Sequence, residues 1–117
     1  MWLKAFKSDE VRPGHARCFS HARVRIGIFR TETGLFAVHN TCPHFDADLH
    51  FGEVKDGMVY CPWHHWRFHL ESGFCETGER YDIAVYPIKE EAGYIWVDPE
   101  AGSIHERPTC DGETYSS

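Results

Sequence analysis

Two short segments of the chain each place a cysteine just ahead of a histidine. The first is Cys42-Pro43-His44, and after a gap of 16 residues the second is Cys61-Pro62-Trp63-His64. Thiolates and imidazoles are ligands that many transition metals prefer. Because a cysteine and a histidine two or three residues apart can share one tight turn, each segment can reach two neighbouring metal ions. The four side chains therefore predict a metal centre held by two loops.

A structural zinc-binding module is the alternative use of two cysteines and two histidines. Zinc motifs pair like ligands, as C-x₂₋₄-C followed by H-x₃₋₅-H, whereas unlike ligands are paired in both segments here. The pattern favours an iron–sulfur cluster in which two histidines replace two cysteines on one of two irons. Replacing two thiolates by neutral imidazoles brings the oxidised cluster from a charge of about −2 to about 0, so it accepts an electron more readily.

Residues 42–68 resemble the cluster-binding region of Rieske-type ferredoxins, the small electron carriers of bacterial oxygenase systems. Besides the four Cys and His residues, the positions that match the family pattern are Ala47, Leu49, Gly52, Trp66 and Phe68. The resemblance implies one Rieske-type [2Fe–2S] cluster per chain, with Cys42 and Cys61 on one iron and His44 and His64 on the other. It also implies that single electrons pass from a flavin reductase to a terminal oxygenase.

The chain departs from related proteins in three respects. Respiratory Rieske proteins carry an extra, disulfide-bonded cysteine in each loop, where this chain has Ala47 and Trp63. They also place a Ser and a Tyr hydroxyl near the cluster, where Trp66 and Phe68 stand here. Fewer donors to sulfur stabilise the reduced state less, so we expect a potential near ~ −150 mV rather than ~ +300 mV. His65 replaces a Gly that the family usually has, and the C-x₂-H spacing favours His64 as the ligand.

Composition and charge narrow the function classes. The net charge of −6 argues against nucleic-acid binding and suits steering toward a basic patch on a redox partner. No apolar run approaches 18 residues, and the first residues lack a signal-peptide pattern, so we expect a cytoplasmic protein without a membrane span. We expect a monomer because a soluble electron carrier exchanges between partners. The remaining cysteines have irregular spacing, so we expect free thiols at Cys18, Cys75 and Cys110.

Strand and turn signals run through the chain with little helical periodicity. Residues 24–29 and 35–40 predict a hairpin that leads into the first Cys/His segment, and Asp56-Gly57 predicts a second hairpin between the two segments. Further strands are expected at 66–70, 83–89 and 94–97. The fold class is therefore all-β, a Rieske-like antiparallel sandwich or barrel with a two-loop cluster-binding subdomain. We expect one domain over residues 1–98, with its cluster-binding region at 40–80, and a polar tail at 99–117.

Two functions fit these observations besides the zinc module. The first is a ferredoxin that carries electrons for an oxygenase system. The second is the small Rieske-like subunit of an NADH-dependent nitrite reductase. Many such subunits have lost the ligands, and this chain retains all four, which favours the carrier. Nothing in the sequence resembles an activated nucleophile or an acid–base pair, so we expect no catalysis by this chain alone.

Overall fold

The computed structural model describes residues 1–43, 47–62, 66–76, 78 and 81–106. Within these residues the chain forms antiparallel strands and two short 3-10 helices, η1 (Ser8–Glu10) and η2 (Leu49–Phe51). The strands are β1 (Leu3–Lys7), β2 (Ala16–His21), β3 (Val24–Thr31), β4 (Gly34–His39), β5 (Val54–Lys55), β6 (Met58–Tyr60), β7 (Arg67–His69), β8 (Ile88–Glu91) and β9 (Tyr94–Val97). The all-β prediction is confirmed.

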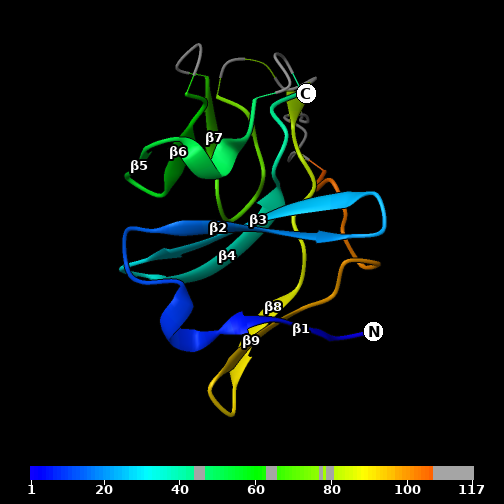
Figure 1. Ribbon diagram of the computed structural model, residues 1–117. Coiled ribbons are helices and arrows are strands. Elements are labelled where there is room, and N and C mark those ends of the chain that lie inside the picture. The colour runs from blue at the N-terminus through cyan, green and yellow to red at the C-terminus, as the bar shows by residue number, and fades with distance from the viewer. Residues whose placement is uncertain (44–46, 63–65, 77, 79–80, 107–117) are drawn as a thin grey trace, which may run out of the picture.

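The strands form three small antiparallel sheets that lie one above another. The strand orders are β1-β9-β8, β2-β3-β4 and β5-β6-β7. Figure 1 shows the β5-β6-β7 sheet at the top, the β2-β3-β4 sheet in the middle and the β1-β9-β8 sheet below. The middle sheet therefore has a neighbour on each of its two faces.

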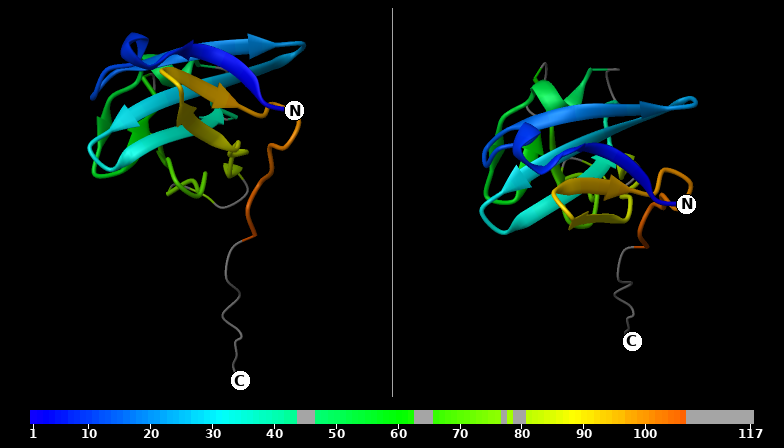
Figure 2. Two further views of the ribbon diagram at one scale, coloured as in Figure 1. Left: turned by 90° about the horizontal axis from the view of Figure 1, so that it is seen from below. Right: turned by 60° about the horizontal axis from the view of Figure 1, so that its bottom comes forward.

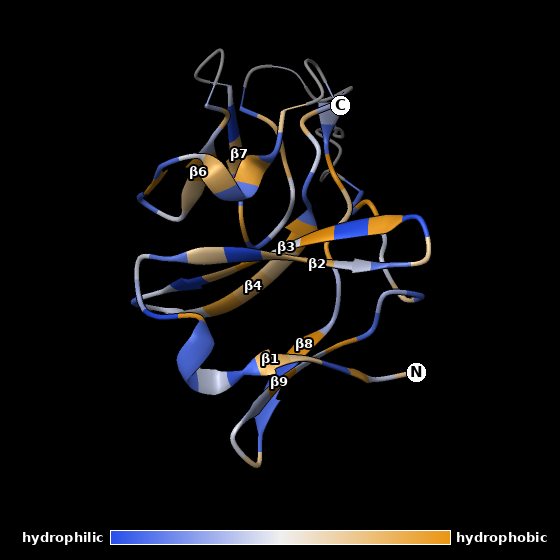
Figure 3. Ribbon diagram, viewed as in Figure 1, coloured by the Kyte–Doolittle hydropathy of each residue, from blue (hydrophilic) through white to orange (hydrophobic). Residues whose placement is uncertain are grey.

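The side chains of β3 explain how the middle sheet serves two cores. Four consecutive residues of β3, from Ile26 to Phe29, are fully or almost fully buried. Because successive side chains of a strand point to opposite faces, Ile26 and Ile28 enter one core and Phe29 enters the other. Figure 3 shows hydrophobic residues along β4 as well, in contrast to the hydrophilic η1.

We name the two cores by their position. The basal core, between the middle and lower sheets, contains Val11, Ile26, Ile28, Ala37, Ile95 and Val97. The ligand-side core, between the middle and upper sheets, contains Phe29, Val38, Cys42, Ala47, Leu49, Val59, Cys61, Phe68, Leu70, Cys75 and Ile83. Both cysteines predicted as metal ligands therefore lie in the ligand-side core.

Two hairpins turn through residue pairs in the left-handed region. Asp56 and Gly57 have φ of 54° and 76° between β5 and β6, and Ala92 and Gly93 have φ of 55° and 82° between β8 and β9. Positive φ at both central residues is the signature of the type I′ turn, which suits the twist of antiparallel strands. The predicted hairpin at Asp56-Gly57 is thereby confirmed.

The chain leaves the middle sheet to build the upper layer and then returns to the point where it left. The His39 amide donates to the Ala84 carbonyl (2.9 Å), the Tyr86 amide donates to the Ala37 carbonyl (2.9 Å), and Val38 pairs with Val85. Residues 40–84 thus form one excursion between β4 and the strand that follows. The returning segment pairs with β4 only locally, and β8 begins at Ile88, after Pro87, so the strand expected at 83–89 is shorter than predicted. Proline has no amide hydrogen to donate to a sheet.

The N-terminus lies on the lower side of the molecule, whereas the described chain ends near the upper sheet, where His105 and Glu106 line a surface depression together with Asp56, Gly57 and His69. Figure 2 shows the N-terminus beside the segment that leaves β9, and the Met1 ammonium lies 3.1 Å from an Asp98 carboxylate oxygen. Ser103 then pairs with Val85 through two hydrogen bonds of 3.0 Å. Among the described residues, no helix has the length and apolar character needed to cross a membrane.

Candidate metal centre

The first ligand loop, residues 42–47, starts three residues after β4 ends. The Cys42 amide donates to the Ala47 carbonyl (2.8 Å), and Thr41 pairs with Asp48 across the base of the loop. One step further out, the Leu49 amide donates to the Asn40 carbonyl (2.6 Å). Cys42 itself is fully buried. The loop is therefore a closed excursion whose cysteine points into the ligand-side core.

The second ligand loop, residues 61–66, repeats this construction. The Cys61 amide donates to the Trp66 carbonyl (2.7 Å), again five residues further along the chain, and Cys61 is 1% exposed. Strand β6 enters this loop and β7 leaves it, with Tyr60 paired to Arg67 at its base. Two loops of equal length thus present two buried cysteines from the same starting position.

Gly52 is where the supports of the two loops touch. It follows η2, which continues from the first loop, and it packs against the main chain of Tyr60, the residue before Cys61. A Cβ atom at Gly52 would overlap the Tyr60 carbonyl oxygen. The Tyr60 amide also donates to the Glu53 carbonyl (2.8 Å). Only a residue without a side chain lets the two loops approach this closely, which explains the Gly in the motif.

A third segment, leading from β7 to Ile83, covers the second loop. Cys75 pairs with Phe68, and its amide donates to the Asp82 carboxylate (2.8 Å). The Tyr81 ring meets the Trp66 ring edge to face, with centroids 4.8 Å apart. These aromatic rings pack against the ligand-side core, so they help to exclude water from the two cysteines.

A buried polar group supports the first loop from below. Asn40 is fully buried, and its Oδ1 accepts a hydrogen bond from the His50 amide (2.9 Å). Its Nδ2 lies 2.8 Å from His50 Nδ1. Beside them the Arg25 guanidinium donates to the Asp48 carboxylate (2.6 Å), and this bond raises the pKa of Arg25. The exit of the first loop is thus fixed by side-chain as well as main-chain bonds.

Two histidines near the first loop are held in their neutral form. Burial lowers the pKa of His39, at the end of β4, below its ordinary value. Burial also lowers the pKa of His50; the nearby Asp48 carboxylate opposes this shift and Arg25 adds to it. Neither group adds positive charge to the base of the loop at neutral pH.

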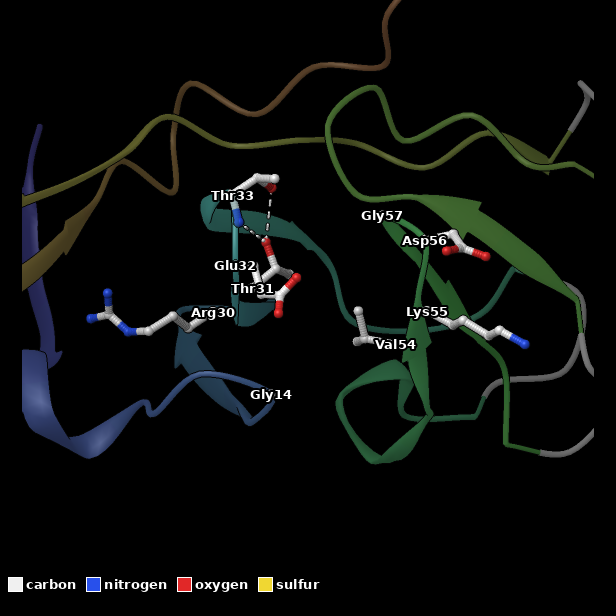
Figure 4. Close-up of a pocket in the computed structure, with 9 residues that line it drawn as sticks. All are labelled: Gly14, Arg30, Thr31, Glu32, Thr33, Val54, Lys55, Asp56 and Gly57. Carbon is white, nitrogen blue, oxygen red and sulfur yellow. Dashed lines mark hydrogen bonds between the residues drawn. The ribbon is translucent and has the colours of Figure 1, made fainter.

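A surface depression of about 490 Å³ lies away from the cysteines. It separates the β3–β4 turn from the β5–β6 turn, as Figure 4 shows. Thr31 and Thr33 hydrogen-bond to each other on one wall, and Lys55 and Asp56 stand on the other. None of the described residues that line it carries sulfur or an imidazole, so it lies apart from the two cysteines.

The described donors fit a cluster with sulfur ligands on two loops. Cys42 and Cys61 are buried in one core, and soft thiolates are the ligands of iron–sulfur clusters. The predicted histidine ligands His44 and His64 lie outside the described residues, as do His65 and Cys110. Cys18 is half-buried on β2 and forms no disulfide.

Sequence reasoning did not single out Asn40, Gly52 as a contact between loops, or the Tyr81–Trp66 pair. An asparagine directly after the apolar strand β4, two positions before a ligand cysteine, is the one signal that pointed to buried polar support. The partner of that asparagine is His50, ten residues further on, and no local spacing identifies it.

Comparisons with known proteins agree with this geometry. The chain is 32% identical over 106 residues to the biphenyl dioxygenase ferredoxin subunit of Pseudomonas sp. (strain KKS102), covering 89% of this chain and 97% of that protein. Its fold matches the ferredoxin of carbazole 1,9a-dioxygenase from Nocardioides aromaticivorans IC177 with a TM-score of 0.78 and 22% identity, covering 85% of this chain and 98% of the other. A candidate NADH-dependent nitrite reductase small subunit from Mycobacterium tuberculosis also gives a TM-score of 0.78, at 26% identity, covering 91% of this chain and 97% of the other.

Some relatives are much longer than this chain. It spans 25% of the 3-chlorobenzoate-3,4-dioxygenase oxygenase subunit of Comamonas testosteroni, with 32% identity over 112 residues that cover 82% of this chain. The sequence profile of the Rieske [2Fe–2S] domain matches residues 1–87. Together with the paired loops and their buried cysteines, this match establishes that the chain belongs to the Rieske [2Fe–2S] domain family.

Proposed function

We propose that Cys42 and Cys61 bind one iron of the [2Fe–2S] cluster and that His44 and His64 bind the other. The observation that carries the proposal is the repeated loop: each cysteine is buried, and each donates its amide to the carbonyl five residues later. The matching hydrogen bonds at the bases of the two loops support equivalent roles for the two cysteines. When bound, the cluster accepts and releases single electrons, and the protein supplies the ligands and excludes water.

The chain acts in electron transfer, and we propose that it does so as a carrier rather than as an enzyme. Its donor would be a flavin reductase and its acceptor a terminal oxygenase. The near-complete coverage of a dioxygenase ferredoxin subunit, at 32% identity, supports this role. We propose that it is a monomer of the cytoplasm, with one domain over residues 1–98 and a polar tail at 99–117.

The charge distribution supports docking by the ligand-bearing side. Residues 42–82 contain eight acidic and three basic residues, a net charge of 8 − 3 = 5 negative charges out of the chain's total of −6. Such a concentration of charge steers encounter with a basic surface and increases the association rate at low salt. We therefore propose that both redox partners present basic surfaces to this region.

The second candidate function is the small subunit of an NADH-dependent nitrite reductase. It is favoured by the solved structure at 26% identity, which covers almost all of both chains. The two functions differ in the lifetime of the complex: a carrier exchanges between partners, whereas a subunit stays bound to its enzyme.

The first experiment is an EPR spectrum of the anaerobically purified, dithionite-reduced protein, with iron and acid-labile sulfide measured on the same sample. A rhombic Rieske-type signal with two irons and two sulfides per chain is the expected result. Stoichiometric zinc with no EPR signal would refute the ligand proposal. A midpoint potential of ~ −150 mV is expected from Trp66 and Phe68, which offer no hydroxyl to the cluster.

A second experiment separates carrier from subunit. The carrier, reduced by NADH through a dioxygenase reductase component, should reduce cytochrome c in multiple turnovers at catalytic concentration. The rate should fall as salt is raised, because screening weakens steering. A chain that is reduced only once, within a stable complex with a larger enzyme, would favour the nitrite reductase role.

A further inference from the structure

Asn40 occupies a position where its side chain has only one possible orientation. Its Oδ1 accepts from the His50 main-chain amide (2.9 Å), which is a permanent donor. Turning the side-chain amide over would bring its NH₂ group against that N–H, and two donors cannot bond to each other. The Nδ2 group is therefore the one that faces His50 Nδ1, at 2.8 Å.

The fixed orientation of Asn40 dictates the protonation of the His50 ring. Because Nδ2 only donates, Nδ1 of His50 must accept, and the proton of the neutral ring must reside on Nε2. A protonated ring would place a second donor against Nδ2 and break the bond. The His50 ring is thus locked in one tautomer by a residue two positions before Cys42.

The space for this arrangement is reserved by Gly27 on β3. A Cβ atom there would lie 2.6 Å from Asn40 Oδ1 and 2.8 Å from Phe29 Cε1. The main chain of Asn40 is held as well, since its amide donates to the Arg25 carbonyl (2.9 Å) and its carbonyl accepts from Leu49 (2.6 Å). Asn40 therefore connects the strand that enters the first ligand loop to the helix that leaves it.

We propose that Asn40 is a positioning residue for the cluster: it fixes His50 as the Nε2–H tautomer and thereby keeps the base of the first ligand loop closed. The inference rests on the proposed function, because it assigns the loop to cluster binding. Loss of the Asn40–His50 bond would let residues 48–50 separate from β4. The base of the loop would then open, and water and chelators would reach the cluster.

The surroundings of His50 are consistent with a neutral ring. Among the residues that the structure describes, the charged groups near His50 are Asp48, on its own segment, and Arg25 from β3, which bond to each other. Cys18 of β2 lies against Arg25. Phe51 covers the ring of His50, with centroids 4.0 Å apart. Within the described part of the chain these two charges offset each other, so the Asn40 bond determines the tautomer.

The tautomer can be read directly in the wild-type protein. Long-range ¹H–¹⁵N NMR of the oxidised protein, with His50 assigned through the His50→Gln variant, should show a protonated Nε2 and an unprotonated Nδ1. A proton on Nδ1 at neutral pH would overturn the proposal. This measurement does not depend on the folding of any variant other than the one used for assignment.

Two variants test the effect on the cluster. His50→Gln retains a side-chain oxygen that can accept from Asn40 Nδ2, whereas His50→Leu has no acceptor. With excess chelator at 20 °C, we expect bleaching of the visible absorption at least tenfold faster in His50→Leu than in wild type. In His50→Gln the rate should stay within twofold of wild type, since the bond is restored.

The matched control is Ile95→Val, a change in the basal core that lowers overall stability far from the ligand loops. It should lower the melting temperature without changing the bleaching rate. Equal bleaching rates in His50→Leu and wild type, or equally fast bleaching in Ile95→Val and His50→Leu, would refute the positioning role. If the protein holds no iron or sulfide, the proposed function fails, and the NMR measurement still decides the tautomer.

Discussion

Replacing Gly27 with Ala should destabilise the protein, because the new side chain would clash with buried residues of the middle sheet and of the segment after it. The new Cβ would lie 2.6 Å from Asn40 Oδ1 and 2.8 Å from a ring carbon of Phe29, whereas ordinary contacts begin at 3.4 Å. Relief at the first contact requires a shift of 3.4 − 2.6 = 0.8 Å. A shift of this size lengthens the Asn40–His50 bonds from 2.8–2.9 Å toward 3.7 Å, beyond hydrogen-bond range.

The free-energy cost follows from the two bonds and the clash. A buried polar group without its partner costs about 1–3 kcal/mol, and overpacking costs about 1–3 kcal/mol. Because relief of the clash and loss of the bonds are alternatives to some extent, we expect about 2–4 kcal/mol rather than the full sum. For a domain of this size this corresponds to a fall in Tm of roughly 8–16 °C.

Thermal unfolding followed by far-UV circular dichroism, at fixed protein concentration and cluster content, measures this effect. Gly78→Ala is the matched control, since among the described residues its Cβ would come no closer than 3.4 Å, to the Tyr81 ring, and its φ is not positive; it should change stability by less than about 0.5 kcal/mol. The double variant with Asn40→Ala should be more stable than additivity predicts, because the clash is gone. A wild-type Tm for Gly27→Ala, or strict additivity, would refute the reasoning.

Three further perturbations test other parts of the structure. Gly52→Ala should leave the purified protein with less than half of the wild-type iron and sulfide, because the new Cβ drives the Tyr60 carbonyl, and with it the second loop, away from the first; full cluster content would contradict this. Burial lowers the pKa of His39 and of His50 in the folded protein below the ordinary 6.5, so the unfolded state binds more protons at acidic pH. The free energy of unfolding should therefore be highest above pH ~6.5 and decline as the pH falls from there toward the folded-state pKa values. Urea midpoints measured from pH 7.5 to 5 should show this decline, and it should be shallower in His50→Gln. Arg30→Ala should lower the free energy of unfolding by about 2–3 kcal/mol, since the guanidinium donates to the Val11 and Ser8 carbonyls as well as to Glu90. Glu90→Gln should lower it by less than about 1 kcal/mol, because Glu90 is 38% exposed. Equal urea midpoints for the two variants would show that the carbonyl bonds contribute nothing.

The sequence predicted those parts of the structure whose causes are local. The Asp56-Gly57 pair specifies its hairpin because both residues tolerate positive φ. The β3–β4 hairpin follows from the β-branched residues at alternate positions of β3, which is typical of a strand. The spacing of cysteine and histidine indicated the loops because ligand geometry is itself local. These signals lie within about ten residues of the structure that they determine.

The parts that escaped prediction depend on contacts between distant segments. The Asn40–His50 bond requires that η2 return to the end of β4, and the Tyr81–Trp66 contact requires that the third segment return to the end of the second loop. The strand expected at 83–89 is shortened because Pro87 lies within it and because residues 84–86 follow β4 instead. Secondary-structure propensity cannot predict such contacts between distant segments, because each contact depends on which side chains become buried together in the folded protein.

The return of the chain to β4 has a further consequence. A hydrogen bond joins residues 39 and 84, so the ligand-bearing segment between them leaves the lower two sheets and returns to them at the same point. A segment with adjacent ends is an insertion: it can gain or lose residues, change its surface charge or exchange its aromatic cover without altering the spacing of the strands that carry it. The lower two sheets can then remain an unchanged scaffold. Redox tuning and partner choice can diversify in the excursion alone, and a transplanted excursion needs only two neighbouring strands to receive it.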